Sequence, residues 1–341
     1  MSRSLFTLDL AAIRHNARVL LGVLGGAELW AVVKADAYGH GAADVARAAL
    51  DAGATALCVA TAGEAEAIRP AAQGARVIVM GPSSPADVVL ARELGAEIVV
   101  ADGATPVPEG IPVHLKLDTG MGRWGLAELP ALGRDVVGLM SHFASADSDP
   151  AFTRLQTARF LEATAPHAHL TRHLANSAGA LRFPEARLDA ARCGIALYGI
   201  SPFHGDAADD GLRPALRWES EVVQVRRLAP GDGTGYGRRF VAVAATWIGL
   251  VPVGYADGFR RDLTGTEVLV EGRRRRIVGT VSMDVAAVEL ESAVPVGAPV
   301  TLVGDGITIE EHARVAGTIG YEIACGFTSR GPRAQRQVTD G

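Results

Sequence analysis

The chain is poor in lysine, asparagine, cysteine and aromatic residues. Of its 341 residues, 33 are lysine or arginine, and only Lys34 and Lys116 are lysines, which leaves 31 arginines. Asparagine occurs only at Asn16 and Asn176. Such a skew usually reflects a biased genome or a hot habitat, but it is a useful filter. Arginine is permanently charged, whereas lysine can lose its proton and act as a nucleophile, so a retained lysine can mark a position that arginine cannot serve.

Other scarcities exclude whole classes of protein. The three cysteines, Cys58, Cys193 and Cys325, have no CxxC or zinc-type spacing, which indicates a reduced, cytoplasmic protein. No apolar run of about 18 residues and no signal-peptide pattern is present, so we expect no membrane partner. The net charge of −5 argues against a nucleic acid or an anionic membrane surface as the main partner.

What is present is an alternation of short apolar runs with helical patterns. The apolar fraction of 48% is normal for a globular chain. Eight runs rich in valine, isoleucine and leucine are typical of buried parallel strands, and mostly helical segments separate them. The pattern predicts a (β/α)8 barrel, with an open doubly wound sheet as the less favoured alternative. The predicted strands are Leu29–Val33, Ala56–Ala60, Val77–Met80, Ile98–Ala101, Val113–Leu117, Val136–Met140, Leu170–Leu174 and Ile195–Ile200.

After about Leu212 the pattern becomes β-rich, with glycine, proline and aspartate at the turns and one helical stretch at Glu310–Ile319. We therefore predict an α/β barrel (TIM-like) followed by a mostly β C-terminal domain. The predicted domains are a barrel at 9–210 and a β-rich domain at 211–341. A strand predicted at 1–8 is expected to belong to the β-rich domain. The predicted strands of this domain are Trp218–Arg227, Phe240–Val253, Glu267–Val270, Arg276–Val281, Val285–Leu290 and Val300–Val303.

Several reactive side chains fall where barrel strands end, which is where barrel enzymes carry their chemistry. Lys34 closes the first predicted strand, Arg123 follows the fifth, and His142 ends the sixth. Asn176 and Ser177 end the seventh, and a glycine-rich turn around Gly194 is a typical phosphate site. A lysine beside a phosphate cradle suggests pyridoxal 5'-phosphate, since only an amine can bond covalently to its aldehyde.

The chain resembles the alanine racemase family of barrel-type (fold III) pyridoxal phosphate enzymes over essentially its whole length. One matching stretch would be weak, but several in the family's order are specific. The matching stretches are Ala31–Gly41, Lys116–Arg123, Ser141–Ala144, Ala175–Ser177, Arg192–Gly199, Gly235–Gly237, Gly254–Gly258, Ser282–Asp284, Tyr321–Ile323 and Arg330–Arg333.

The resemblance implies a two-base racemisation. Lys34 matches the lysine that holds the cofactor and acts on the D-substrate, and Tyr236 matches the base for the L-substrate, donated by the partner subunit of a homodimer. Two bases serve racemisation because the α-proton leaves from one face and returns to the other. His142 matches the residue that hydrogen-bonds this tyrosine. Arg192 matches the arginine facing the pyridine nitrogen, which suppresses side reactions because it has no proton to give.

The remaining site residues follow from the same resemblance. Arg123 matches an arginine near the cofactor and the substrate carboxylate, and Lys116 matches a lysine that many members carry carbamylated. A carbamate at Lys116 would pair with Arg123. The residues that match phosphate ligands are Tyr38, Ser177, Gly194 and Ile195, and Asn176 matches a further cofactor contact. Met283 and Asp284 match the substrate loop, which comes from the partner chain. Tyr255 and Arg261 match the access corridor.

Two positions depart from the family pattern. Thr280 stands where members often have arginine, which removes a corridor charge, and Ser329 stands where they often have a tyrosine that contacts the phosphate. The implied function is interconversion of L- and D-alanine, supplying D-alanine for peptidoglycan in a bacterial source. Because Thr280 would widen the corridor, a racemase of serine or of a broader range of amino acids remains an alternative. A non-catalytic pyridoxal phosphate carrier is the alternative of another class.

Three further patterns are given little weight. Gly231–Gly237 resembles a dinucleotide-binding turn, but a β-like stretch follows it. The basic run Arg273–Arg276 is interpreted as a solvated turn. A zinc site at His167, His169 and His173 lacks a completing carboxylate or cysteine, so no metal is expected, and His173 is predicted to point into the barrel.

Overall fold

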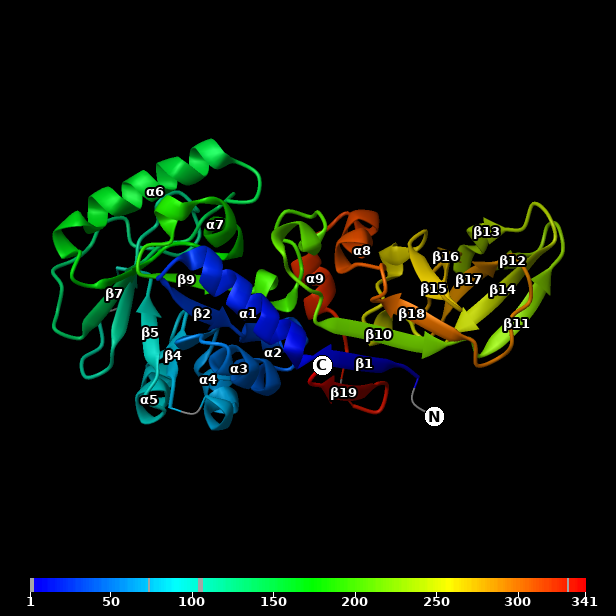
Figure 1. The fold of residues 1–341 in the computed structure, drawn as a ribbon, viewed down its shortest axis with the longest axis horizontal. Helices are drawn as coiled ribbons and strands as arrows, with labels where there is room; N and C mark the ends of the chain where they lie inside the picture. Colours follow the sequence, from blue (N-terminus) through cyan, green and yellow to red (C-terminus); the bar gives the residue numbers. More distant parts are fainter. Residues whose placement is uncertain (1–2, 73, 104–106, 330) are drawn as a thin grey trace. The chain divides into compact units, whose positions relative to one another are not determined.

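The computed structural model describes residues 3–72, 74–103, 107–329 and 331–341. Arg330, part of one matching stretch, therefore lies outside the described residues. The chain divides into two compact units, and each is described by itself. One consists of Ala11–Arg213, and the other combines the N-terminal residues through Leu10 with Pro214–Gly341 (Figure 1).

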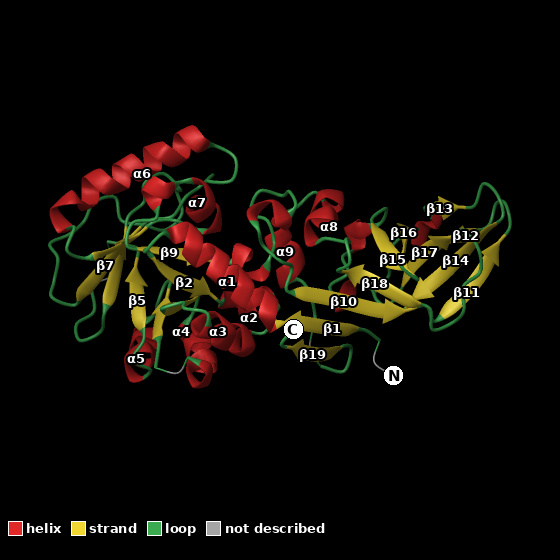
Figure 2. Ribbon diagram, in the orientation of Figure 1, coloured by secondary structure: helices red, strands yellow, loops and turns green. Residues whose placement is uncertain are grey.

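The first unit is a closed barrel of parallel strands with helices around it (Figure 2). The predicted barrel is confirmed. Most residues of its strands are buried, as expected for a parallel sheet that is covered on both faces. They are β2 (Glu28–Val32), β3 (Ala56–Val59), β4 (Arg76–Val79), β5 (Glu97–Val100), β6 (Val113–Lys116), β7 (Val136–Met140), β8 (Thr171–His173) and β9 (Ala190–Cys193). The helices are α1 (Leu10–Leu24), α2 (Lys34–Tyr38), α3 (Ala42–Asp51), α4 (Ala62–Ile68), α5 (Pro85–Glu93), α6 (Pro150–Thr164) and α7 (Ser177–Arg182).

The prediction of the eighth barrel strand at Ile195–Ile200 is wrong. The strand is β9, which ends at Cys193, and Ile195–Tyr198 forms a 3₁₀ turn after Gly194. This run is apolar because it is fully buried, and the Tyr198 hydroxyl donates to the carbonyl of Val32 at 2.6 Å. Burial without periodicity does not distinguish a strand from a buried turn.

The second unit is built on a nine-stranded sheet of the described residues, in the order β11-β14-β17-β16-β15-β18-β10-β1-β19. β1 lies between β10, to which it is antiparallel, and β19, to which it is parallel. A separate pair, β12 (Gly233–Thr234) and β13 (Phe240–Val241), precedes β14. The sheet strands are β1 (Leu5–Asp9), β10 (Leu216–Glu221), β11 (Gln224–Leu228), β14 (Thr246–Val251), β15 (Glu267–Val270), β16 (Arg273–Val278), β17 (Ala286–Leu290), β18 (Pro299–Val303) and β19 (Gln335–Thr339).

Several details of this unit differ from the prediction. The single strand predicted at Trp218–Arg227 is two strands, β10 and β11. Helix α8 (Ile309–Ala316) is followed by α9 (Gly320–Cys325), which the sequence analysis did not predict, nor did it predict β19. Arg273–Arg276 is not a turn but the start of β16, where Arg274 pairs with Glu267 and Glu311, and Arg275 pairs with Glu291. Arginines can continue an exposed strand face when acidic residues lie beside them.

Within the described residues, no helix is both long enough and apolar enough to span a bilayer.

Candidate active site

Lys34 follows β2 and begins a turn of unusual backbone conformation. Ala35–Tyr38 all have positive φ, between 50° and 54°, which costs about 1–2 kcal/mol per residue outside glycine. Hydrogen bonds offset this strain: Glu64 accepts the Ala35 N–H at 2.8 Å, and Asp36 accepts the Ala42 N–H at 2.8 Å. The turn therefore fixes Lys34 at the carboxyl end of its strand, as a barrel active site requires.

Four basic side chains act together on His142, at the end of β7. Burial, then the charges of Arg192, Lys116, Arg123 and Lys34, lower the pKa of His142 well below its ordinary value. Burial and the charge of Arg123 also lower the pKa of Lys116 to about 8. These predicted site residues are thus brought together at one end of the barrel. The site suits an anionic ligand, because cations in a buried place repel one another unless an anion joins them.

The Arg192 side chain is almost fully buried inside the barrel, and no carboxylate of the described residues is bonded to it. Its Nη1 contacts His173 Nδ1 at 2.6 Å and donates to the His173 carbonyl at 2.7 Å. Its Nη2 donates to the Ser141 carbonyl at 2.7 Å and makes a longer contact of 3.3 Å with His142 Nδ1. Both terminal nitrogens are therefore occupied by protein groups, and among the described residues the Nε–H remains for a ligand.

The predicted phosphate ligands form a cradle at the ends of β8 and β9. The Ser177 hydroxyl accepts the Gly194 N–H at 3.1 Å, and Asn176 caps α7 by accepting the Gly179 N–H at 2.8 Å. A Cβ built on Gly194 would lie 2.5 Å from the Tyr38 hydroxyl oxygen, so a side chain there would displace that hydroxyl. As the first residue of a helical turn, Ile195 has an N–H without an acceptor in that turn. The Tyr38 and Ser177 hydroxyls and the Ile195 N–H are donors that fit a phosphate group, and the Gly194 N–H, which here donates to Ser177, lies beside them. The Lys34 amine and the Arg192 Nε–H fit the rest of pyridoxal phosphate.

Gln156 of α6 is a supporting residue that the sequence analysis missed. Its amide donates to the His142 carbonyl at 3.1 Å and to the Thr119 hydroxyl at 3.3 Å, and its oxygen accepts the Ala144 N–H at 2.9 Å. It is fully buried and fixes the loops that carry His142 and follow Lys116. A glutamine in a helix with no clear apolar stripe gives little signal, and only the fold brings it to these loops.

In the second unit, Tyr236 follows Gly235 in a turn that Thr280 holds. The Thr280 hydroxyl donates to the Tyr236 carbonyl at 2.9 Å, and Thr280 is only 5% exposed. A Cβ on Gly235 would lie 3.0 Å from the Thr280 nitrogen, so the two segments are closely packed. The tyrosine side chain itself is 72% exposed. Thr280 therefore fixes the backbone of the Tyr236 turn, a role that the sequence analysis did not assign to it.

The loops that carry Tyr255 and Met283 are joined by their backbones. The Tyr255 N–H donates to the Ser282 carbonyl at 3.0 Å, and the Ala256 N–H donates to the Met283 carbonyl at 3.1 Å. A Cβ on Gly254 would lie 2.2 Å from the Ser282 carbonyl oxygen, so this approach requires glycine. The side chains of Tyr255 and Met283 remain about half exposed.

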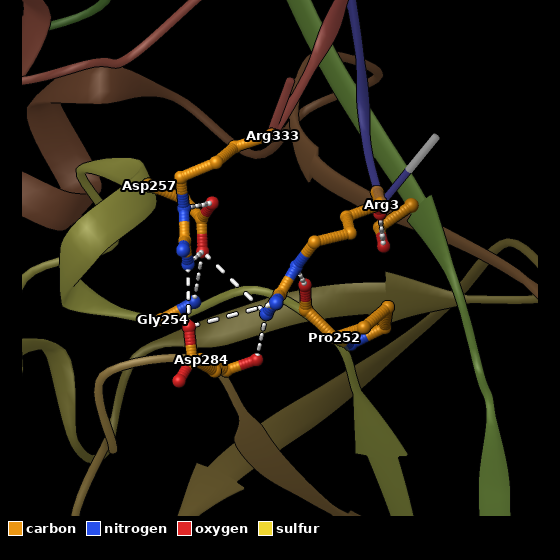
Figure 3. A network of polar contacts seen from close by, with 7 residues as sticks. Arg3, Pro252, Gly254, Asp257, Asp284 and Arg333 are labelled. Carbon is orange, nitrogen blue, oxygen red and sulfur yellow. Dashed lines mark hydrogen bonds and ion pairs between the residues drawn. The ribbon is translucent and has the colours of Figure 1, made fainter. Parts of the chain in front are cut away.

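An ion-pair network that we call the Asp257 clamp ties these loops to both ends of the chain (Figure 3). Asp257, whose side chain is 1% exposed, accepts two bonds from Arg333, at 2.7 and 3.1 Å, and the Gly254 N–H at 2.9 Å. Arg333 also donates to Asp284 at 2.7 Å, which lowers the pKa of that carboxyl, and Arg3 donates to the Asp284 carbonyl. The clamp therefore fixes the backbone on which Met283 and Tyr255 are displayed.

The remaining predicted residues differ in how deeply their side chains are buried. Arg123 is exposed, and its guanidinium lies 5.4 Å from the centre of the Trp124 ring. Arg261 is exposed, and Ser329 is buried. His173 is fully buried and contacts Arg192, as predicted for a residue pointing into the barrel. Cys193 is also buried, which raises the pKa of its thiol to about 12 and makes it an unreactive core residue.

Comparison with known proteins gives one consistent result. Residues 8–202 match the family described as alanine racemase, N-terminal domain, and residues 215–335 match alanine racemase, C-terminal domain. Alanine racemase 1 of Bacillus subtilis (strain 168) is 39% identical over 96% of this chain and 91% of its own length. The biosynthetic alanine racemase of Pseudomonas aeruginosa is 36% identical with a TM-score of 0.92, covering 99% of this chain and 100% of that one. The alanine racemase of Bartonella henselae, solved with covalently bound pyridoxal phosphate, is 25% identical with a TM-score of 0.88 over 99% and 100% of the two chains.

Proposed function

Because the chain belongs to the alanine racemase family, we propose that Lys34 and Tyr236 are its two catalytic bases and that pyridoxal phosphate is its cofactor. The activity is the interconversion of L-alanine and D-alanine, and no comparison favours a serine racemase or a non-catalytic carrier. The observation that carries the proposal is the convergence of Lys34 with a phosphate cradle and a buried arginine at one end of the barrel.

The cofactor, when bound, would supply an aldehyde that links to the substrate amine and a ring that accepts electron density from the α-carbon. Its phosphate would be held by Tyr38, Ser177 and the backbone of Gly194 and Ile195, with Asn176 fixing the start of α7 beside them. Ser329 is a further candidate for a phosphate contact. Arg192 would present its Nε–H to the ring nitrogen. Since a guanidinium does not give up that proton, the ring stays neutral and electron withdrawal stays moderate, which favours racemisation over transamination.

The protein's own groups then move one proton. Lys34 removes or returns the α-proton of the D-substrate, and Tyr236 does the same for the L-substrate. His142 is neutral near pH 7 because burial and the nearby cations lower its pKa. With Nδ1 facing the donor Arg192, His142 carries its proton on Nε2 and is able to stabilise a charged tyrosine oxygen.

The second unit supplies Tyr236, Met283 and Asp284, with Tyr255 and Arg261 along the access path. The exposure of Tyr236 and Met283 supports the proposal that they enter the site of a partner subunit in a homodimer. Arg123 and Met283 would bind the substrate carboxylate. The absence of a cysteine framework supports a cytoplasmic enzyme, and in a bacterial source its D-alanine would supply peptidoglycan.

Reductive trapping tests the role of Lys34. Borohydride reduction of the purified protein fixes the cofactor to the amine that holds it, and peptide mapping identifies that amine. The chain offers only two side-chain amines, and we expect the label at Lys34 and none at Lys116. Lys34→Arg keeps a cation but no nucleophile, so it should lose both label and activity. A label on Lys116, or a labelled Lys34→Arg protein, would contradict the proposal.

Lys116 is proposed to carry a carbamate. Its pKa of about 8 leaves a substantial neutral fraction near that pH, and only the neutral amine reacts with CO₂. The resulting anion would pair with Arg123 and remove the repulsion between the two cations. Carbon-13 bicarbonate should therefore give a labelled carbamate signal in the native enzyme and none in Lys116→Arg. An unlabelled native protein at pH 8 would exclude the modification.

A further inference from the structure

A line of four buried polar side chains crosses the barrel interior from Arg192 to Glu97, and we call it the barrel relay. Arg192 Nη1 contacts His173 Nδ1 at 2.6 Å. His173 Nε2 lies 2.9 Å from His114 Nδ1, and His114 Nε2 lies 2.7 Å from Glu97 Oε2. Both histidine rings are fully buried, and Glu97 is 8% exposed. Glu97 is the first residue of β5, at the end of the barrel away from Lys34.

The two ends of the barrel relay determine where its protons lie. Arginine can only donate, and a carboxylate can only accept. His173 must therefore accept at Nδ1 and carry its proton on Nε2, which it donates to His114 Nδ1. His114 then carries its proton on Nε2 and donates it to Glu97. Any other arrangement sets two donors or two acceptors against each other. Burial also lowers the pKa values of both histidines, which agrees with neutral rings.

The barrel relay connects a buried cation to a buried anion. Arg192 makes no ion pair in the described residues, and burial lowers its pKa to about 10. Burial alone would raise the pKa of Glu97, but bonds from His114 and Arg76 outweigh it and lower that pKa to about 2. Hydrogen bonds in a chain polarise one another in a low-dielectric interior, so the Glu97 charge supports the guanidinium through two rings.

The two histidine rings of the barrel relay are closely packed by the surrounding residues. A Cβ built on Gly138 of β7 would lie 2.1 Å from His114 Nδ1, so the ring occupies the space of a missing side chain. Trp30 of β2 packs against both histidines, with ring centres 5.7 Å from His114 and 4.5 Å from His173. The rings therefore cannot turn freely to exchange donor and acceptor positions.

We infer that Glu97 is a positioning residue for Arg192: it fixes the protonated nitrogen of His114 and His173, so that Arg192 always faces an acceptor and keeps its Nε–H on the cofactor ring. The inference rests on the proposed function for the role of Arg192. It assigns an effect on the active site to a residue at the opposite end of the barrel, where barrel residues ordinarily serve stability alone.

Glu97→Gln is the informative substitution because it keeps the shape and adds a donor. Glu97 Oε2 faces both His114 and Arg76 Nη2, whereas Oε1 faces Arg76 Nε. A glutamine whose NH₂ takes the place of Oε2 donates to His114, which moves the proton of both histidines from Nε2 to Nδ1 and sets a His173 N–H against Arg192. A glutamine whose NH₂ takes the place of Oε1 instead opposes the Arg76 Nε–H; the first orientation loses the Arg76 bond of 3.0 Å and the second loses the bond of 2.7 Å. Arg76→Gln is the matched control, since it breaks the same ion pair but leaves the carboxylate for His114.

Nitrogen-15 NMR of labelled histidines in the holoenzyme tests the barrel relay directly. The native enzyme should show two buried neutral histidines protonated on Nε2, identified by their loss in His114→Gln and His173→Gln. Arg76→Gln should keep this pattern, and Glu97→Gln should change it. A charged or Nδ1-protonated ring in the native enzyme would overturn the inference whatever the activity.

A second measurement tests the effect on the active site. Pyruvate formed from alanine reports transamination, and its ratio to racemisation should rise about tenfold in Glu97→Gln and remain native in Arg76→Gln, since a lost hydrogen bond to a charged group changes an equilibrium by about that factor. Cofactor affinity, measured by absorbance titration, should fall in Glu97→Gln alone. Equal ratios in the two variants would overturn the positioning role. The proposed function fails separately, if borohydride labels a residue other than Lys34.

Discussion

The candidate site residues of the barrel and those of the β-rich unit are held in opposite ways. In the barrel, the side chains themselves are fixed: Arg192 and Ser177 are almost fully buried, and each makes hydrogen bonds to protein atoms. In the β-rich unit, the proposed base has a fixed backbone and an exposed side chain: Thr280 holds the Tyr236 carbonyl, whereas Tyr236 is 72% exposed. The barrel thus presents a preformed set of side chains, whereas the Tyr236 side chain is exposed in the structure of the single chain.

Because of this difference, substitutions in the two units should affect protein stability and enzymatic activity differently. Substitution of an exposed side chain away from any network usually changes stability by no more than about 0.5 kcal/mol, whereas breaking a buried polar network costs several times more. We therefore expect barrel substitutions to change both properties, and exposed side chains of the β-rich unit to change activity alone.

The largest expected effect is that of Tyr236→Phe. Loss of a general base reduces a rate by about 10²- to 10⁴-fold, and the exposed hydroxyl contributes little to folding, so racemisation should fall with an unchanged melting temperature. In D₂O, the variant should still exchange the α-proton of D-alanine through Lys34 and lose exchange of L-alanine. Tyr255→Phe, also exposed, is the control. Undiminished L-alanine racemisation in Tyr236→Phe would refute the two-base assignment.

The acid stability of the barrel should depend on Glu97. Its pKa is lowered to about 2 in the folded protein from 4.5, so its ionised form stabilises the fold fully above pH 4.5 and loses this effect as pH falls toward 2. The shift corresponds to at most about 3 kcal/mol. Urea unfolding of the native protein and of Glu97→Gln should therefore differ most at neutral pH and converge below pH 4.5. A constant difference between pH 7 and pH 3 would contradict this account.

The Asp257 clamp should behave like a barrel network although it lies in the β-rich unit. Asp257→Asn leaves Arg333 beside a neutral amide, and we expect a loss of about 2 kcal/mol, less than for a fully buried pair because Arg333 is 29% exposed. The KM for alanine should also rise, since the Met283 loop loses its anchor. Arg3→Gln is the control: Arg3 contacts Asp257 only at 3.9 Å and otherwise donates to the Pro252 and Asp284 carbonyls from a partly exposed position, so its effect should be smaller than that of Asp257→Asn. Equal losses in both variants would show that the bidentate Arg333 pair is not the main anchor.

The smallest expected effect is that of Thr280→Val, which removes one hydroxyl bond to the Tyr236 carbonyl. We expect a loss of about 1 kcal/mol in stability and a modest fall in kcat, with the preference for alanine over serine unchanged. Serine racemisation that rises in Thr280→Val or falls in Thr280→Ser would instead place this residue at the substrate, and would make the β-rich unit responsible for selectivity.

The barrel, the β-rich unit and the residues that match the family were predictable from the sequence, because apolar periodicity and short motifs are local properties. The sequence placed seven of the barrel strands and misplaced the eighth, because burial at Ile195–Ile200 comes from packing and not from strand pairing. The tertiary structure alone decided that Gln156 supports His142, that Thr280 holds the Tyr236 turn, and that Glu97 is bonded through two histidines to Arg192. These contacts join residues far apart in the chain, and no local pattern in the sequence encodes which strand ends will meet.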